Sequence, residues 1–286
     1  MHDDRPSKTA FRVALRRAAH QVLDDPRVFE DPLALAIVGA DAGELRSDDK
    51  NQERVSRAMR AFMAVRSRYA EDGLAAAFED GTRQYVVLGA GLDTLAYRNP
   101  FSGLRVFEVD HPATQGWKRH RLEAAGIAVP ESMTFAPVDF ERQTLAEGLA
   151  RAGFQTDQKA FFSWLGVVPY LTRSAALETL RFVASLPPES EIVFDYALPP
   201  ESLDPVRRQA LEALAARVAA SGEPFQTFFD PAELESELRR MGFVSFEDLG
   251  TEEINMRYFS GRSDGLRVGG GIGRLMRARV GYPSTG

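Results

Sequence analysis

Hydrophobic residues recur at two different spacings along the chain and divide it into two regions. Over residues 9–23, and from about residue 59 to 78, apolar side chains return every three or four positions with arginines between them, which predicts amphipathic helices. From residue 81 onward, short apolar runs of strand length alternate with helical stretches. We therefore predict an N-terminal helical cap over residues 1–80 and a core over residues 81–286.

The predicted cap contains two further polar signals. Asp31 and Pro32 predict the start of a short helix, with Asp31 as N-cap and Pro32 at the first helical position. The strongly polar residues 41–53 predict either a loop or the exposed start of the long helix that follows. The cap is thus expected to be mostly helical.

Apolar runs in the core predict a parallel sheet. They occupy residues 85–88, 104–110, 133–140, 160–165 and 191–197. Helical patterns follow the second and fourth runs. This alternation is typical of right-handed βαβ units, so we predict an α/β fold with helices on both faces of the sheet.

The alternation breaks after residue 198. Residues 199–228 contain a helical pattern after two prolines and are predicted to be an inserted lid. A helix over 231–241 and two closing strands over 243–249 and 253–259 are expected to follow. The basic residues 274–279 are expected to form a helix after a glycine-rich linker.

Composition excludes several classes of chemistry. The chain has no cysteine, so disulfides and thiolate metal sites or nucleophiles are excluded, and its four histidines form no metal-binding spacing. A net charge of −6 disfavours general binding of nucleic acid. No apolar segment has the length of a membrane span or a signal peptide. We expect a cytoplasmic protein without metal, membrane or nucleic-acid partners.

A glycine-rich turn follows the first predicted strand. Gly89, Ala90 and Gly91 stand where a dinucleotide or nucleoside cofactor binds in such folds, because glycine lets the backbone approach a ligand closely. Thr94 holds the third position of the G-x-G-x-x-G pattern, and we expect a helix to begin at about Asp93. The alternative is a tight turn with no ligand.

Acidic residues end the next two predicted strands. Asp110 follows Gly91 by 19 residues, the place of a carboxylate that accepts ribose hydroxyls. The alternative is that Asp110 caps the helix beginning at Pro112. Asp139 and Phe140 are suited to bind the amine and the ring of an adenine, or else cap a loop and fill the core.

These residues together predict a nucleoside cleft. Carboxylates would repel a pyrophosphate but tolerate a sulfonium cation, which favours S-adenosylmethionine over a nicotinamide dinucleotide. An NAD(P)-dependent oxidoreductase is the alternative, although the missing third glycine disfavours it. A non-catalytic nucleoside-binding protein is a further alternative.

The motifs of residues 86–98, Val-Val-Leu-Gly-Ala-Gly-Leu-Asp-Thr-Leu-Ala-Tyr-Arg, and of residues 107–112, Phe-Glu-Val-Asp-His-Pro, resemble those of the leucine carboxyl methyltransferase superfamily. The similarity is greatest to its actinobacterial branch of S-adenosylmethionine-dependent methyltransferases and covers residues 8–277. The resemblance implies a class I methyltransferase fold, Rossmann-like, whose extra helices form a lid over the acceptor pocket.

The resemblance also implies roles for particular residues. Gly89, Asp110, Asp139 and Phe140 would hold the cofactor, with Ala90 and Gly91 in the same turn. Arg66 matches an arginine that pairs with the methionine carboxylate; the alternative for Arg66 is a solvated helix face. Arg16 or Arg17 is a candidate second partner for that carboxylate.

One position departs from the family pattern. Leu165 stands where the family usually has a glutamate in the motif after the fourth strand, so a polar contact near the sulfonium or the acceptor is missing. Asp195 and Tyr196, at the end of the fifth strand, either orient a substrate or serve the core.

The expected activity is methyl transfer from S-adenosylmethionine to a small-molecule acceptor, by O-methylation of a carboxylate or a hydroxyl. A carboxylate acceptor is ionised at neutral pH and needs no general base. A phenol or enol would benefit from one, and His111 and Tyr170 are the candidate catalytic residues.

Overall fold

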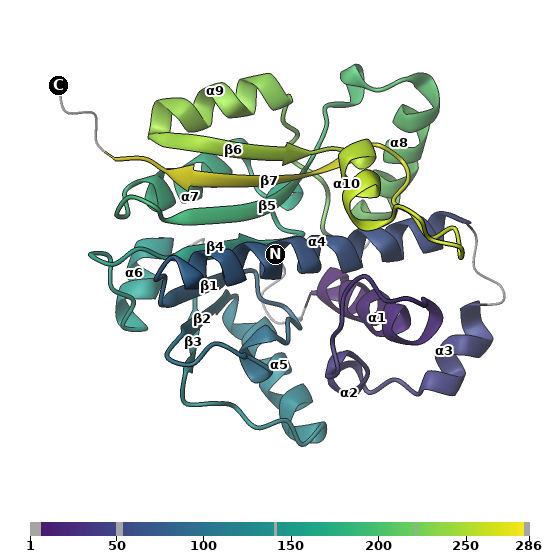
Figure 1. Ribbon diagram of the computed structural model, residues 1–286, viewed down its shortest axis with the longest axis horizontal. Helices are drawn as coiled ribbons and strands as arrows, with labels where there is room; N and C mark the ends of the chain where they lie inside the picture. The colour runs from purple at the N-terminus through teal and green to yellow at the C-terminus, as the bar shows by residue number, and fades with distance from the viewer. Residues whose placement is uncertain (1–6, 50–53, 140–141, 221, 283–286) are drawn as a thin grey trace.

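The computed structural model describes residues 7–49, 54–139, 142–220 and 222–282. Its centre is a seven-stranded sheet of order β3-β2-β1-β4-β5-β7-β6 (Figure 1). The strands are β1 (Gln84–Leu88), β2 (Arg105–Asp110), β3 (Met133–Pro137), β4 (Phe161–Trp164), β5 (Glu191–Ala197), β6 (Phe243–Leu249) and β7 (Gly273–Val280). The first five pair in parallel, and β7 lies antiparallel between β5 and β6.

Helices surround this sheet and extend beyond one of its ends. They are α1 (Lys8–Leu23), α2 (Ala34–Val38), α3 (Ala42–Asp49), α4 (Arg54–Glu79), α5 (Pro112–Ala124), α6 (Leu145–Arg151), α7 (Arg173–Ala184), α8 (Pro205–Ala219), α9 (Pro231–Met241) and α10 (Thr251–Tyr258). Three 3-10 turns complete them: η1 (Leu95–Tyr97), η2 (Val168–Tyr170) and η3 (Pro200–Ser202). None of the helices in these described ranges is long and apolar enough to cross a membrane.

Both faces of the sheet are buried, as the continuous apolar runs predict. All five side chains of β1 are buried. Val86 and Leu88 belong to a core shared with α6, α7 and α9, whereas Tyr85 and Val87 belong to a core shared with α4 and α10. Because successive side chains of a strand point to opposite faces, a strand covered on both sides has apolar residues at every position.

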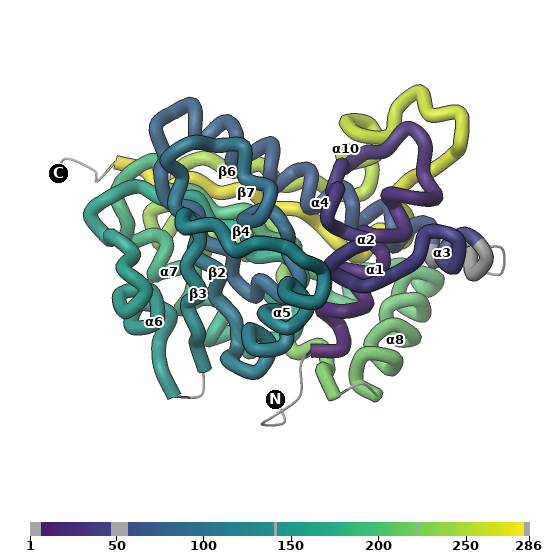
Figure 2. Tube along the Cα trace, turned by 90° about the horizontal axis from the view of Figure 1, so that it is seen from below, coloured from purple at the N-terminus to yellow at the C-terminus, as the bar shows by residue number. Residues whose placement is uncertain are grey.

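The N-terminal helix and the inserted segment meet at one end of the sheet. Figures 1 and 2 show α1 and α8 beyond the carboxyl ends of the parallel strands, with α1 beside the start of α4. The backbone N–H and the hydroxyl of Thr9 both donate to the carboxylate of Glu223. At the end of the insertion, Gln226 and Thr227 donate backbone N–H groups to the carbonyl of Pro169. The segment 199–228 is therefore bonded to both α1 and η2.

Two predictions for the C-terminal part were wrong. Residues 253–259 lie mostly in a helix, α10, whose start is stabilised because the Glu253 carboxylate accepts the N–H of Gly250 at 3.0 Å. Residues 274–279 form strand β7, not a helix. The basic residues of β7 pair with acids on its two neighbours, since Arg274 bonds Asp248 and Arg277 bonds Glu191.

Predictions that rested on polar residues, in the N-terminal helices and after the glycine turn, were less accurate than predictions that rested on apolar residues. The short helix begins at Ala34 and not at Pro32; Asp31 accepts the N–H of Leu33 at 3.1 Å just before it and is also paired with Arg17. Residues 42–49 form a helix of their own, α3, so they are neither a loop nor the start of the long helix α4. After the glycine turn only the 3-10 turn η1 forms, with the Asp93 carboxylate accepting the N–H of Leu95 at 2.9 Å.

Candidate cofactor site

The order of the strands reverses at the carboxyl end of β1, the place where a ligand crevice is expected. The chain runs from β1 outward to β2 and β3 on one side, then returns to β4 and β5 on the other. The connections that follow β1 and β4 therefore run towards opposite edges of the sheet. In open α/β sheets, ligands bind outside the carboxyl ends of the strands at such a point.

The glycine turn lies at this point in a conformation that requires glycine. Gly89 has φ of 67° and Gly91 has φ of 48°, both in the left-handed region. A β-carbon on Gly89 would lie 2.4 Å from a methyl group of Val167, and one on Gly91 would lie 3.1 Å from the β-carbon of Ala10 in α1. The turn is thus packed closely beneath the loop after β4 and the N-terminal helix.

Asp110 is tied to this turn. One of its carboxylate oxygens accepts the N–H of Gly91 at 2.6 Å, and the other accepts the N–H of His111 at 2.7 Å. Burial raises the pKa of Asp110, which these two donors partly oppose. Each oxygen accepts one hydrogen bond from the protein and retains capacity for another donor.

Asp110 is not the cap of the following helix. The N-cap of α5 is His111, whose Nδ1 accepts the N–H of Ala113 at 3.2 Å. A neutral imidazole that accepts at Nδ1 carries its proton on Nε2. In this arrangement Nδ1 is engaged by the backbone of α5 and Nε2 remains as a hydrogen-bond donor.

The end of β3 is described only in part. Asp139 is half-buried, its carboxylate lies 3.4 Å from Nε of Arg142, and its carbonyl accepts the N–H groups of Arg142 and Gln143. Phe140, the predicted aromatic partner, lies outside the described residues. The structure therefore brings Asp139 to the same sheet edge as Asp110, since β3 pairs in parallel with β2.

Arg66 lies on the other side of the crevice. It projects from α4, is 4% exposed, and bonds Asp195 at the end of β5, with 2.9 Å between Nη1 and Oδ2. The second oxygen of Asp195 accepts the N–H of Gly166, in the loop after β4. Arg66 is therefore not on a solvated helix face. The sequence left open whether Asp195 orients a substrate or serves the core. Its spacing from Arg66 did not predict the bond between them.

Tyr170 is the last residue of η2 and contacts the segment 199–228. Its ring packs against Phe225 of the inserted segment at 5.2 Å between centroids. Burial raises its pKa, and the nearby Arg66 opposes that shift. The hydroxyl therefore stays protonated at neutral pH and is a hydrogen-bonding group, not a base.

The two arginines of α1 have different surroundings. Burial, followed by the charges of Arg12, Arg217 and Arg66, lowers the pKa of Arg16, so its guanidinium shares the surroundings of Arg66. Arg17 faces the opposite way and bonds Asp31. Of the two candidates for a second carboxylate partner, only Arg16 lies near Arg66.

Comparison with known proteins identifies the family. The model of the family described as "Leucine carboxyl methyltransferase" matches residues 10–184. A Bacillus subtilis protein named "Putative S-adenosyl-L-methionine-dependent methyltransferase YktD" is 34% identical over 93% of this chain and 95% of its own. The chain belongs to the leucine carboxyl methyltransferase family. It is accordingly an enzyme that uses S-adenosylmethionine, as the motifs predicted.

Other relatives agree. A Saccharopolyspora erythraea protein, named "Putative S-adenosyl-L-methionine-dependent methyltransferase", is 35% identical over 62% of each chain, in keeping with the predicted similarity to the actinobacterial branch. A solved Thermobifida fusca structure described as a putative methyltransferase superposes with a TM-score of 0.56 at 17% identity, covering 87% of this chain and 93% of its own. A DUF574 family protein from Streptomyces avermitilis gives the same TM-score at 17% identity, over 86% and 95%. These superpositions confirm the predicted fold class.

The donor set of this methyltransferase fits its cofactor. S-adenosylmethionine carries two vicinal ribose hydroxyls, an adenine amine, a sulfonium, and an α-ammonium beside an α-carboxylate. The crevice offers spare acceptor capacity on Asp110, a carboxylate at Asp139, and an adjacent cation and anion at Arg66 and Asp195. Acceptors and charges are thus available for each polar part of the molecule.

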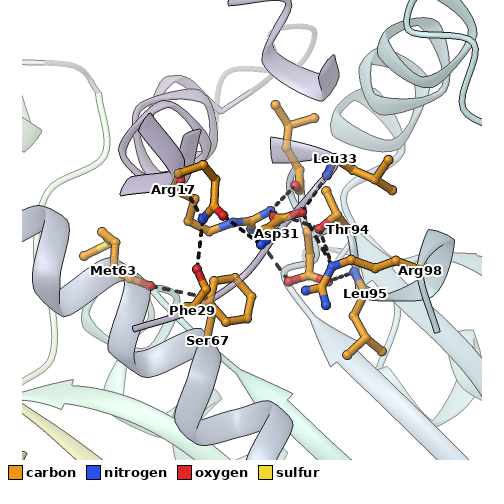
Figure 3. Close-up of polar contacts among 12 residues, drawn as sticks. Arg17, Phe29, Asp31, Leu33, Met63, Ser67, Thr94, Leu95 and Arg98 are labelled. Atoms are coloured by element: carbon orange, nitrogen blue, oxygen red, sulfur yellow. Dashed lines mark hydrogen bonds and ion pairs between the residues drawn. The ribbon is translucent and has the colours of Figure 1, made fainter. Parts of the chain in front are cut away.

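A buried ionic cluster joins the helical cap to the glycine turn (Figure 3). Arg17 donates to Asp31 at 2.8 Å and to the carbonyl of Leu92 at 3.1 Å. Arg98 lies 3.5 Å from the other oxygen of Asp31 and also donates to the hydroxyl of Thr94 at 3.2 Å. Burial opposes the charge of Asp31, yet Arg17 and Arg98 hold its pKa below the ordinary value. Sequence reasoning missed this cluster, because its members are far apart in the chain.

Proposed function

We propose that the enzyme transfers a methyl group from S-adenosylmethionine to an oxygen atom of a small-molecule acceptor, and that this acceptor is a carboxylate. The observation that carries the cofactor assignment is the bond between Asp110 and the glycine turn at the reversal of strand order, in a chain of this family. The choice of acceptor rests on the chemistry of the candidate bases.

The proposed cofactor contacts lie along the edge of the sheet formed by the carboxyl ends of the parallel strands. Gly89, Ala90 and Gly91 would lie beneath the cofactor, and Asp110 would accept its ribose hydroxyls. Asp139 would accept the adenine amine. Arg66 would pair with the methionine carboxylate, for which a buried guanidinium with several donors is suited.

Phe140 has a role in this scheme on sequence grounds alone. It lies outside the described residues, so its packing against the adenine stays a prediction from the Asp-Phe pair at the end of the third strand. An aromatic ring at that level of the sheet would cover one face of the base.

The two candidate bases favour an acceptor that is already ionised. The cofactor supplies an activated methyl group, and its transfer is an in-line displacement in which the protein positions the reactants and excludes water. His111 has its Nδ1 occupied by the N–H of Ala113, and the pKa of Tyr170 is raised by burial. The lone pair of Nδ1 is thus engaged in the helix cap, and the Tyr170 hydroxyl stays protonated at neutral pH. A carboxylate acceptor needs no proton removed, since it is ionised at neutral pH.

The glycine turn is covered by α1, which is bonded to residues 199–228. Ala10 of α1 lies against Gly91, and Thr9 bonds Glu223 of the inserted segment. Entry of ligands therefore requires α1 or residues 199–228 to move, and their return would exclude water from the reacting groups. This is the physical basis for a lid.

Ligand binding tests the proposal directly. Calorimetry should show binding of S-adenosylhomocysteine with a dissociation constant on the order of micromolar (about −8 kcal/mol). Binding of NAD without S-adenosylhomocysteine would instead indicate an oxidoreductase. Incubation with cofactor carrying a labelled methyl group should then label carboxylic acids in a panel that also contains matched alcohols and phenols. Labelling of the hydroxyl compounds alone would refute the carboxylate acceptor.

A further inference from the structure

We propose that Asp195 recognises the α-ammonium of the cofactor and so replaces the glutamate that the family usually has at position 165. The proposal rests on the proposed cofactor site and adds a residue to it. Asp195 would supply a carboxylate to the amino-acid end of the cofactor although Leu165 carries no polar group.

The strand register places the two positions side by side. β4 and β5 pair in parallel, with Trp164 opposite Phe194. The next residues, Leu165 and Asp195, therefore stand at the same level where the two strands end. Leu165 packs on the core beneath α4, so this level would have no carboxylate from β4. The neighbouring strand supplies one instead.

The carboxylate of Asp195 is held firmly. One oxygen accepts from Nη1 of Arg66 at 2.9 Å, and the other accepts the N–H of Gly166. Gly166 has φ of 73°, and a β-carbon there would lie 2.8 Å from Nη2 of Arg66. Glycine is thus required both by its backbone conformation and by the guanidinium that lies against it. Asp195 itself is 6% exposed.

The geometry matches the charge pattern of an amino acid. The methionine end of the cofactor has a carboxylate and an ammonium on one carbon atom, and Arg66 and Asp195 present the opposite charges in direct contact. An ammonium has three donors, and each oxygen of Asp195 has used only one acceptor position within the described residues.

A purely structural ion pair is the competing explanation. In that case Arg66 and Asp195 would only hold α4 against the end of β5. The two explanations differ in which ligands lose affinity when the charge of Asp195 is removed. A purely structural role lowers the affinity for every ligand of the crevice equally. A direct role affects only ligands that carry the α-ammonium, whereas loss of support for Arg66 would also weaken binding of a deaminated analogue of S-adenosylhomocysteine that keeps the carboxylate. A loss of affinity for that analogue in Asp195→Asn therefore overturns the direct role.

The test compares two ligands that share the nucleoside. S-adenosylhomocysteine has the amino-acid end, whereas 5′-methylthioadenosine lacks it. For Asp195→Asn, calorimetry should show about a 10- to 100-fold loss of affinity for S-adenosylhomocysteine, and unchanged affinity for 5′-methylthioadenosine. Leu165→Glu combined with Asp195→Asn should restore much of the lost affinity, because it returns a carboxylate to the same level of the sheet.

A matched control lies on the same strand. Glu191 is 2% exposed and bonds Arg277 at 2.5 Å, but it lies at the opposite end of β5. Glu191→Gln removes a buried, arginine-paired charge from the same strand and should leave the affinity for both ligands unchanged.

The outcomes separate the two proposals. Failure of the unmodified protein to bind S-adenosylhomocysteine overturns the proposed cofactor site. The role of Asp195 is overturned if the unmodified protein binds S-adenosylhomocysteine and Asp195→Asn binds it equally well. It is also overturned if Asp195→Asn loses the same affinity for both ligands. If Asp195→Asn alone does not fold, the double variant decides. It should prefer S-adenosylhomocysteine over 5′-methylthioadenosine as the unmodified protein does, and the absence of that preference overturns the proposal.

Discussion

Replacing Arg17 with methionine should destabilise the protein by about 3–4 kcal/mol. Arg17 is 5% exposed, and its loss leaves the carboxylate of Asp31 buried without its nearest cation. Breaking a buried pair by removing one partner costs about 3–5 kcal/mol, and the carbonyl of Leu92 also loses a donor. Arg98, 3.5 Å from Asp31, still offsets part of that charge, so the lower half of the range is expected.

Urea unfolding at pH 7, followed by circular dichroism, measures this loss. Arg68→Met is the matched control, because Arg68 bonds Asp72 at 2.7 Å but has a side chain 49% exposed, and exposed pairs contribute about 1 kcal/mol or less. Adding Asp31→Asn to Arg17→Met should recover part of the stability, since it removes the unpaired charge. A loss for Arg17→Met no larger than that of Arg68→Met would refute the reasoning.

Three further predictions concern the cofactor site, the cap and the lid. Asp110→Ala should weaken binding of S-adenosylhomocysteine about 10- to 100-fold and Asp110→Asn less, because the amide keeps one acceptor oxygen; calorimetry on both variants checks this, and affinity equal to that of the unmodified protein would exclude the ribose role. Asp24 is buried, which opposes its charge, but bonds from Arg60 and His20 lower its pKa to about 2. The ionised Asp24 therefore stabilises the fold above its unfolded pKa. This contribution is lost as the pH falls from about 5 towards 2. Asp24→Asn should therefore be less stable at pH 7 by about 2 kcal/mol, with a difference that shrinks as urea unfolding is repeated at lower pH; a constant difference would contradict it. Hydrogen exchange in residues 199–228 should slow when S-adenosylhomocysteine binds, and unchanged exchange there and in α1 would argue against a lid.

The parallel part of the fold was predictable because strands that are buried on both faces can be recognised in the sequence as short apolar runs. Each strand from β1 to β5 is a short apolar run, and helices recur between most of them. The glycine turn and Asp110 were predictable for the same reason, since both follow immediately from the end of a recognised strand. Their mutual contact at 2.6 Å agrees with the 19-residue spacing that indicated a common site.

The errors arose where tertiary contacts override local pattern. Residues 274–279 were predicted to be helical, but they pair with β5 and β6 as a strand, where Arg274 bonds Asp248 and Arg277 bonds Glu191. The same limit explains why the partner of Arg66 was not predicted. Asp195 is 129 residues away in the chain, and only the register of β4 and β5 brings it beside the loop that holds Gly166.

The position of β7 has a consequence for how the chain is made. This strand is late in the sequence, yet it lies inside the sheet, between β5 and β6. Until residues 273–280 emerge during synthesis, the fully buried strand β5 has an unpaired edge, and such edges pair readily with other chains. Nascent or truncated chains that end before residue 273 are therefore expected to aggregate, although every residue of the proposed cofactor site has already been made.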